Sequence, residues 1–226
     1  MRIILAALIV GISALFGLSA RAADLPPYPG VPEVDYGLQG GFYLRGSVGL
    51  NALWTQEHID TCACSVPPTA AGYGYSLGGG VGYEFGNGFR VDGTFDYLSN
   101  DGLTDGTNTL HLRAGVALAN AYYDFPLSGA SAAGGFGAYV GGGVGAAYYQ
   151  VSVTPTDPTV PDGSGWTPAA AAMAGVTYDG GSWVADLGYR LIYMPKISNY
   201  ATSPLSPWYI YDNTVSEVQA SVRYRF

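Results

Sequence analysis

Histidine, cysteine and acidic side chains are the residues of this 226-residue chain whose types and spacing could support metal or thiol chemistry. His58, Asp60, Cys62 and Cys64 stand at alternate positions, a spacing that could supply metal ligands. In an exported protein two cysteines more often form a disulfide, although a Cys-x-Cys bridge is short and strained. A disulfide or an intermolecular thiol role for Cys62 and Cys64 is therefore favoured over a metal site or over neither role, and these interpretations stay open.

Catalysis by a nucleophile or an activated water needs a histidine with an orienting carboxylate close to it. The chain has two histidines, His58 in a predicted connection and His111 beside Arg113 on a predicted strand, and neither stands in a recognisable motif. The stretch Gly141–Ala146 matches a loose dinucleotide pattern, but it lies within a predicted strand that no helix follows. We therefore expect no catalytic residue, no cofactor and no bound metal.

Most of the other charged residues alternate with apolar or small ones, which is the pattern of strands with one apolar and one polar face. In the segment 89–97, Arg90, Asp92 and Asp96 occupy even positions between apolar odd ones. If the apolar faces meet lipid, the polar faces share one interior, where an unpaired ion is costly. We therefore predict an internal network of ion pairs that plugs the lumen, with a narrow, gated ion path as the alternative. The predicted members are Arg45, Glu84, Arg90, Asp92, Asp96, His111, Arg113, Asp186, Arg190, Glu217, Arg223 and Arg225.

The alternating segments number eight, and longer connections are interleaved with shorter ones. Gly86–Gly88 and Asp179–Ser182 carry the turn residues of tight hairpins, where positive φ is needed. Long loops at one end and short turns at the other are typical of an up-and-down barrel whose even strand number places both termini at the short-turn end. The predicted connections are residues 52–72, 86–88, 99–108, 126–135, 154–167, 179–182 and 194–213.

One predicted strand and two neighbouring segments are less regular than the rest. From Leu110 to Leu118 the apolar parity opposes His111 and Arg113, and it slips near Ala119, which predicts a bulge there. The segments 136–153 and 168–178 are rich in Gly and Ala, so the sequence does not decide which of their faces meets lipid.

Composition and the amino-terminal segment indicate an exported protein. Arg2 precedes the uncharged run Ile3–Leu18 and a small-residue stretch, the pattern of a secretory signal peptide. The chain has 34 glycines, few charges and more acidic than basic residues, a charge balance that repels nucleic acid. We predict a signal peptide at 1–22, a Pro-rich periplasmic N-terminal tail at 23–40 and a barrel domain at 41–226.

The sequence resembles the small eight-stranded outer-membrane barrels of the OmpA and opacity-protein type, in particular major surface proteins of alphaproteobacteria. The resemblance rests on the signal peptide, on Asn120–Phe125, on Ala138–Ala146 and on the ending Val222–Phe226, and it covers residues 40–226. It implies an all-β fold, an eight-stranded antiparallel up-and-down transmembrane β-barrel in the cell outer membrane. The residues that it identifies as the C-terminal assembly signal are Val222, Tyr224 and Phe226.

A barrel of eight strands is just wide enough for its own side chains, which argues against a general porin. We expect an integral outer-membrane protein with a structural or surface-interaction role, in envelope integrity and loop-mediated contacts. The alternative is a narrow porin-like channel for ions or small solutes, and an outer-membrane lipid-modifying enzyme is less favoured. The expected partners are outer-membrane lipid, lipopolysaccharide and the barrel-assembly machinery, without nucleic acid, and the partner of the loops stays open.

Overall fold

The computed structural model describes residues 40–55, 57–59, 65–66, 71–104, 109–127, 135–154, 162–200, 202 and 208–226. The predicted signal peptide, most of the predicted tail, and Cys62 and Cys64 lie outside these residues. Among the described residues, no helix has the length and apolar character needed to cross a membrane. The strands are β1 Gly41–Trp54, β2 Glu57–Ile59, β3 Ser65–Val66, β4 Gly72–Glu84, β5 Phe89–Thr104, β6 Thr109–Pro126, β7 Gly135–Thr154, β8 Gly163–Asp179, β9 Trp183–Ser198 and β10 Tyr209–Arg225.

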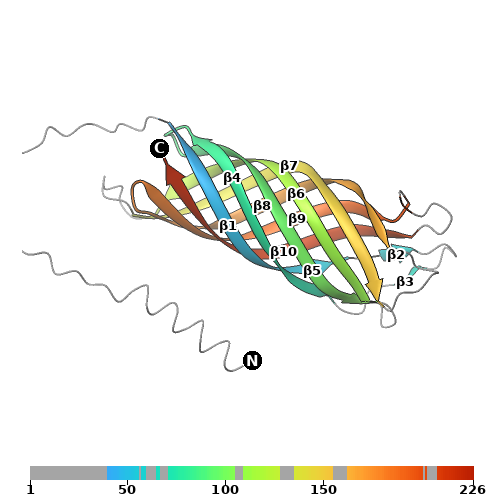
Figure 1. Ribbon diagram of the computed structural model, residues 1–226. Helices are drawn as coiled ribbons and strands as arrows, with labels where there is room; N and C mark the ends of the chain where they lie inside the picture. Colours follow the sequence, from blue (N-terminus) through green and yellow to red (C-terminus); the bar gives the residue numbers. More distant parts are fainter. Residues whose placement is uncertain are drawn as a thin grey trace, which may run out of the picture. The chain divides into compact units, whose positions relative to one another are not determined.

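Eight of these strands close into an antiparallel barrel (Figure 1). Each of them pairs with the next along the chain, and β1 closes the ring by pairing with both β4 and β10. The Phe226 N–H donates to the Phe42 carbonyl oxygen at 3.1 Å, which ties the end of the chain to the first strand. The short strand β2 pairs with the first three residues of β10, and β3 pairs with β2. The predicted eight-stranded up-and-down barrel is confirmed.

The short turns join strands at the end where β10 finishes. Gly86 and Gly88 between β4 and β5, and Gly181 between β8 and β9, have φ between 76° and 88°, as the hairpin pattern predicted. The Asn87 carboxamide accepts from the Phe89 N–H at 3.1 Å, and the Asp179 carboxylate accepts from the Gly181 N–H at 2.8 Å. We call this end the turn side, and the opposite end, with the longer connections, the loop side.

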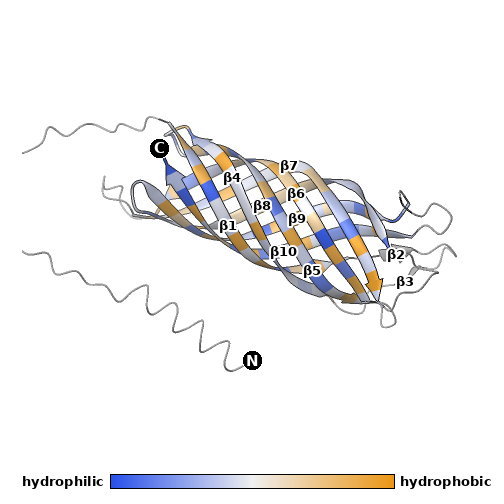
Figure 2. Ribbon diagram, viewed as in Figure 1, coloured by the Kyte–Doolittle hydropathy of each residue, from blue (hydrophilic) through white to orange (hydrophobic). Residues whose placement is uncertain are grey.

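The outer face of the barrel is apolar, and Figure 2 shows the hydropathy alternating along each strand. Leu50, Leu77 and Val144 are examples, with exposed fractions of 72%, 61% and 68%. Exposed aromatic side chains stand near both ends of the strands, where their rings fit the interface between lipid and water. The turn-side girdle consists of Phe42, Phe85, Phe89, Tyr123, Phe125, Phe136, Tyr178, Trp183, Tyr224 and Phe226, and the loop-side girdle of Trp54, Tyr73, Tyr75, Tyr97, Tyr148, Trp166 and Tyr193.

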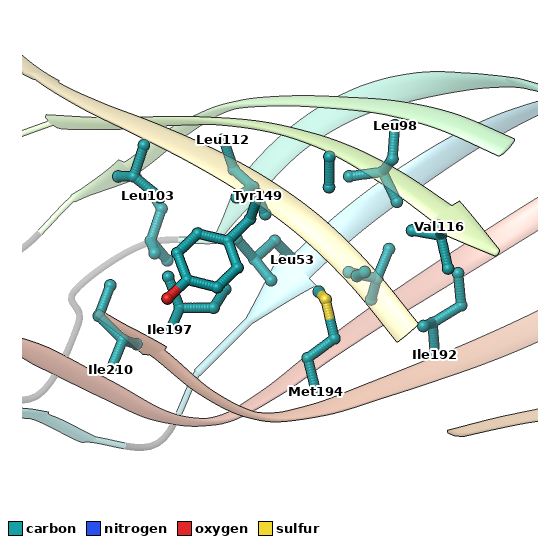
Figure 3. Close-up of a cluster of buried hydrophobic side chains, with 14 of the residues drawn as sticks. Leu53, Leu98, Leu103, Leu112, Val116, Tyr149, Ile192, Met194, Ile197 and Ile210 are labelled. Carbon is teal, nitrogen blue, oxygen red and sulfur yellow. The ribbon is translucent and has the colours of Figure 1, made fainter. Parts of the chain in front are cut away.

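The loop side of the interior holds a cluster of buried apolar side chains, which we call the apolar layer (Figure 3). β6 contributes alternate residues from Leu110 to Leu118, and β9 contributes Ile192, Met194 and Ile197. The full layer is Leu53, Leu98, Leu103, Leu110, Leu112, Ala114, Val116, Leu118, Ala147, Tyr149, Val151, Val153, Ala169, Ile192, Met194, Ile197, Trp208, Ile210 and Val215.

The apolar layer corrects the sequence-based facing of β6. The prediction that Leu110–Leu118 face lipid was wrong, because these apolar residues fill the lumen instead. No bulge occurs near Ala119, since β6 pairs with β5 and β7 in one register on both sides of it. The register shift lies instead in β5 between Asp101 and Leu103. The intervening Gly102 has φ 91°, a value that L side chains rarely adopt.

Candidate functional site

Eight charged side chains lie in the lumen on the turn side of the apolar layer, each with at most 5% of its side-chain surface exposed. They project inward from β1, β5, β9 and β10 because inward and outward residues alternate along each strand. Four are arginines and four are carboxylates, so their formal charges sum to zero. These residues are Arg45, Arg90, Arg190, Arg223, Asp92, Asp96, Asp186 and Glu217.

Asp92 is the centre of the first group of contacts. Its carboxylate accepts from the Tyr43 hydroxyl at 2.9 Å and from the Asn120 amide at 2.7 Å. Arg45 lies 3.4 Å from the same carboxylate and donates to the Tyr122 hydroxyl at 2.8 Å and to the Gln219 carboxamide oxygen at 2.7 Å. Asp92 is therefore a buried ion with donors from β1 and β6 around it.

Arg90 joins this group to the turn-side mouth. Its guanidinium lies 3.7 Å from the centre of the Tyr122 ring, a cation–π contact, and donates to Asp124 at 2.9 Å. The Asp124 side chain is 30% exposed, so it is close to the mouth rather than deep in the lumen. The sequence analysis did not name Tyr122 or Asp124 as network members, although the predicted slip near Ala119 places both on the inward face.

Arg190 bridges two carboxylates in the middle of the lumen. It donates to Asp96 at 2.8 Å and to the two oxygens of Glu217 at 3.1 and 3.2 Å. Both hydrogen bonds to Glu217 come from the Nη2 group, while the Nη1 group donates to Asp96, so one guanidinium serves two carboxylates. Because the Glu217 side chain is fully buried, its charge depends on this contact.

The third group runs from the lumen to the turn-side mouth. Arg223 holds Asp186 through two hydrogen bonds of 3.0 Å, and it also contacts Glu84. Arg225 donates to Glu84 and to Asp179, both at 2.7 Å. Glu84 and Arg225 are 17% and 30% exposed, so this end of the network meets the water at the mouth.

His111 and Arg113 do not belong to the lumen network, and their predicted facing was wrong. Both point out of the barrel near the loop end of β6 because their neighbours Leu112 and Ala114 fill the interior. They meet Asp101 instead: His111 Nδ1 lies 2.8 Å from its carboxylate, and Arg113 donates to it at 2.8 Å. This cluster lies beyond Tyr97 of the loop-side girdle, outside the membrane-spanning part of the strands. The hydrogen bond from Arg113 lowers the pKa of the Asp101 carboxyl.

The other predicted site residues lie outside the lumen or outside the described residues. Val222, Tyr224 and Phe226 point outward with exposed fractions of 55%, 53% and 74%. Cys62 and Cys64 fall in a stretch that is not described, so their redox state stays a prediction. Within the described part of the chain, no group of three or more His, Cys, Asp or Glu side chains is arranged to hold a metal ion.

Residues 10–226 match a family described as "Outer membrane protein beta-barrel domain". Two proteins of Brucella abortus and Brucella melitensis, both named as uncharacterized, are each 31% identical over 239 residues, which cover 84% of this chain and 79% of theirs. Neisserial surface protein A has a similar fold, with a TM-score of 0.54 at 19% identity over 82% of this chain and 97% of that one. OprG of Pseudomonas aeruginosa has a TM-score of 0.47 at 15% identity over 84% and 99% of the two chains. The chain belongs to the outer membrane protein β-barrel family and is an outer-membrane β-barrel protein.

Proposed function

We propose that this protein is a closed outer-membrane barrel that contributes to envelope integrity and to contacts made by its loop side, rather than a channel. The observation that carries the proposal is the double filling of the lumen. The lumen network, with equal numbers of buried arginines and carboxylates, lies on the turn side. The apolar layer lies on the loop side and leaves a void of about 10 Å³ among its side chains, about the volume that one water needs.

The two layers oppose ion passage for different reasons. An ion that crosses the apolar layer loses its hydration and finds no charged partner there. An ion that enters the network has to compete with ion pairs such as Arg190 with Glu217, in which both charges are already neutralised. A path along the network alone therefore ends at the apolar layer.

Recordings in planar lipid bilayers test this proposal against a narrow porin-like channel. We expect no steady openings from the wild-type protein. The variant Glu217→Gln, which changes only the network, is expected to stay closed because the apolar layer is intact. Steady single-channel openings of the wild-type protein, absent from a mock preparation purified in the same way, would contradict a closed barrel.

Deletion of the gene, followed by complementation with a loop-shortened variant, separates a role of the barrel from a role of its loops. We expect the deletion strain to become sensitive to detergents and bile salts. A variant in which the loop-side connections are shortened tests the loops. Rescue of resistance by this variant supports a role of the barrel itself, and failure of rescue supports loop contacts. Wild-type resistance of the deletion strain would overturn the envelope role.

The proposal contains no catalytic step. His111 on the outer face of β6 contacts Asp101, but Arg113 shares the same carboxylate. We expect the variant His111→Ala to leave phospholipid and lipid A profiles unchanged in mass spectrometry. A change in either profile would instead support lipid modification.

A further inference from the structure

The ladder between β8 and β9 stops before either strand ends. Backbone pairing runs from the short turn up to Ala170 and Tyr193. Beyond these residues β8 continues to Gly163 with β7 as its partner, and β9 continues to Ser198 with β10 as its partner. Among the described residues, every other pair of neighbouring barrel strands stays hydrogen-bonded to within one residue of the loop-side end of the shorter strand. We call the unpaired lengths 163–169 and 194–198 the β8–β9 seam.

Two prolines account for the seam. Pro168 lies in the unpaired length of β8 and Pro195 in that of β9. Continuing the register of the paired part would bring these two residues opposite each other, and neither has a backbone N–H to donate. Proline is confined to strand edges for this reason, so the sequence itself makes two local edges in the wall.

The interior behind the seam is the apolar layer and not the lumen network. Ala169, Met194 and Ile197 point inward from the two unpaired lengths, and Trp208 packs beside them within the layer. Figure 3 shows Met194, Ile197 and Tyr149 among the side chains that face one another there. A molecule entering through the seam therefore meets aliphatic and aromatic side chains, and an aliphatic chain is the chemistry that matches them.

The Tyr149 side chain bridges the seam from the inside, and the Thr202 hydroxyl joins its loop-side end by donating to the Asp162 carbonyl oxygen at 3.2 Å. The Tyr149 hydroxyl on β7 donates to the Ser198 carbonyl oxygen at 3.0 Å and accepts from the Ser198 N–H at 2.9 Å. The ring passes Gly165 of β8, where an added Cβ would lie 2.8 Å from the hydroxyl. Tyr149 thus gives Ser198 the two hydrogen bonds that a β8 ladder would otherwise supply.

The outer side of the seam lies at the level of the loop-side girdle. Trp166 of β8 is 73% exposed there, and Tyr193 marks the last ladder pair. Lys196, the one lysine of the chain, is exposed on the unpaired length of β9, with its ammonium group 4.1 Å from the centre of the Tyr209 ring. No carboxylate among the described residues forms an ion pair with it. The mouth of the seam therefore presents a cation without an ion-pair partner, beside the exposed Asp212 carboxylate, which accepts from the Tyr193 hydroxyl at 2.6 Å.

We propose that the β8–β9 seam is a lateral entrance through which the aliphatic chain of a free fatty acid passes from the outer leaflet into the apolar layer, with its carboxylate at Lys196. Because the layer leaves a void of only about 10 Å³ when closed, entry requires Tyr149 to leave Ser198 and the unbranched Met194 side chain to change rotamer, so that space for the chain opens. This goes beyond the proposed function, because the barrel stays closed to ions along its axis while its wall admits an apolar chain sideways.

Quenching of Trp208 by a brominated fatty acid tests the entrance. The variant has Phe in place of Trp54, Trp166 and Trp183, so that Trp208 in the lumen is the only tryptophan and is excited selectively. This variant is placed in liposomes. We expect bromostearate to quench the fluorescence of Trp208. A brominated phospholipid should leave this fluorescence unchanged, because its two chains and glycerol cannot pass the seam. Loss of the two Tyr149 hydrogen bonds in Tyr149→Phe should lower the half-quenching concentration about tenfold. Heat-modifiable migration checks that each variant is folded.

Replacement of the exposed residue Lys196 tests the head-group contact without a change in the fold of the barrel. Lys196→Gln should weaken quenching by bromostearate and leave quenching by the brominated alcohol of equal chain length unchanged. Equal loss for the acid and the alcohol would contradict an anionic head group at Lys196.

A disulfide across the seam distinguishes the lateral route from entry at the loops. With Ser at 62 and 64, Ala169→Cys with Met194→Cys continues the register by one pair and closes the seam when oxidised. The control Ala172→Cys with Leu191→Cys links the same strands within the intact ladder. We expect oxidation to abolish quenching in the first pair alone and reduction to restore it. Quenching that survives closure of the seam, or absence of quenching in every folded variant, overturns the proposal.

Discussion

Each buried ion in the lumen depends on a partner from another strand. Glu217 reaches Arg190 across the β9–β10 pair, and Asp92 on β5 receives hydrogen bonds from Tyr43 on β1 and Asn120 on β6. Taking two such charges out of water costs several kcal/mol, which their mutual attraction offsets only when the geometry is good. Removing one partner is therefore more damaging than replacing both.

Glu217→Gln leaves Arg190 with one anionic partner in place of two. We expect the free energy of unfolding to fall by about 3 kcal/mol, because the buried network then carries an uncompensated charge. The control Asp179→Asn removes an ion pair with 34% of the Asp179 side chain exposed, and should cost no more than about 1 kcal/mol. Urea unfolding of the reconstituted protein, followed by tryptophan fluorescence, measures both. Equal losses would show that burial does not set the strength of these pairs.

Asp101 provides a test outside the membrane-spanning segments. The hydrogen bond from Arg113, and then that from His111, lowers the pKa of this carboxyl below its ordinary value. Because the folded pKa is the lower one, the contact contributes stability above the unfolded pKa of about 4, and this contribution is lost as the pH falls through the folded value. NMR titration should show the lowered pKa in the wild type and a return towards the ordinary value in Arg113→Gln. An unchanged pKa in that variant would assign the shift to another cause.

At the scale of strands, large inward tyrosines lie over glycines of neighbouring strands. An added Cβ at Gly82 would lie 2.3 Å from the Tyr43 ring, and one at Gly141 would lie 2.3 Å from Tyr122. Tyr149 passes Gly165 in the same way. This pairing explains part of the composition, with 34 glycines and 19 tyrosines, because a narrow barrel holds a large side chain only where its neighbour has none.

Gly82→Ala and Gly46→Ala test this packing with the same chemical change on opposite faces. At Gly82 the new Cβ would meet Tyr43 and the Val91 carbonyl oxygen, 2.6 Å away, so we expect a loss of about 1–3 kcal/mol in unfolding free energy. At Gly46, on the lipid face, no atom lies within 4 Å of the new Cβ, and stability should stay the same or rise slightly. The same urea titration compares the two variants. Equal destabilisation would mean that glycine conformation, and not lumen packing, is decisive.

At the scale of the whole molecule, the barrel separates three environments. Lipid meets an apolar belt between two aromatic girdles, the turn-side lumen holds paired charges, and the loop-side lumen holds an apolar core. Backbone polar groups in the membrane are satisfied by closure, which removes sheet edges. The β8–β9 seam departs from that rule at the interface, where Tyr149 substitutes for part of the missing ladder.

Phe226→Ala tests the predicted assembly signal, which belongs to the biogenesis of the whole barrel. We expect a strong decrease of the heat-modifiable form in outer-membrane fractions, with unchanged stability of the variant refolded in detergent. Phe85→Ala is the matched control, because Phe85 is an exposed aromatic residue of the same girdle. A similar decrease for both variants would point to lost girdle contacts rather than to a recognition signal.

The alternation of residue types predicted much of the barrel. It identified the eight strands, the tight glycine turns and the parity of residues such as Arg45, Asp92 and Glu217, because a strand places successive side chains on opposite faces. Strand ends were less accurate, since pairing extends β8 to Gly163 and β5 to Thr104 beyond the segments expected from the pattern.

The tertiary structure alone decided how the interior is divided. A run such as Leu110–Leu118 is equally suited to lipid and to an apolar lumen, because both remove its surface from water, so only its neighbours settle its facing. The same ambiguity led the sequence analysis to place His111 and Arg113 inside the lumen. The sequence by itself determined a barrel with polar and apolar strand faces. Closure of the ring decided which apolar face meets lipid, which charges pair, and where two prolines leave the wall unpaired.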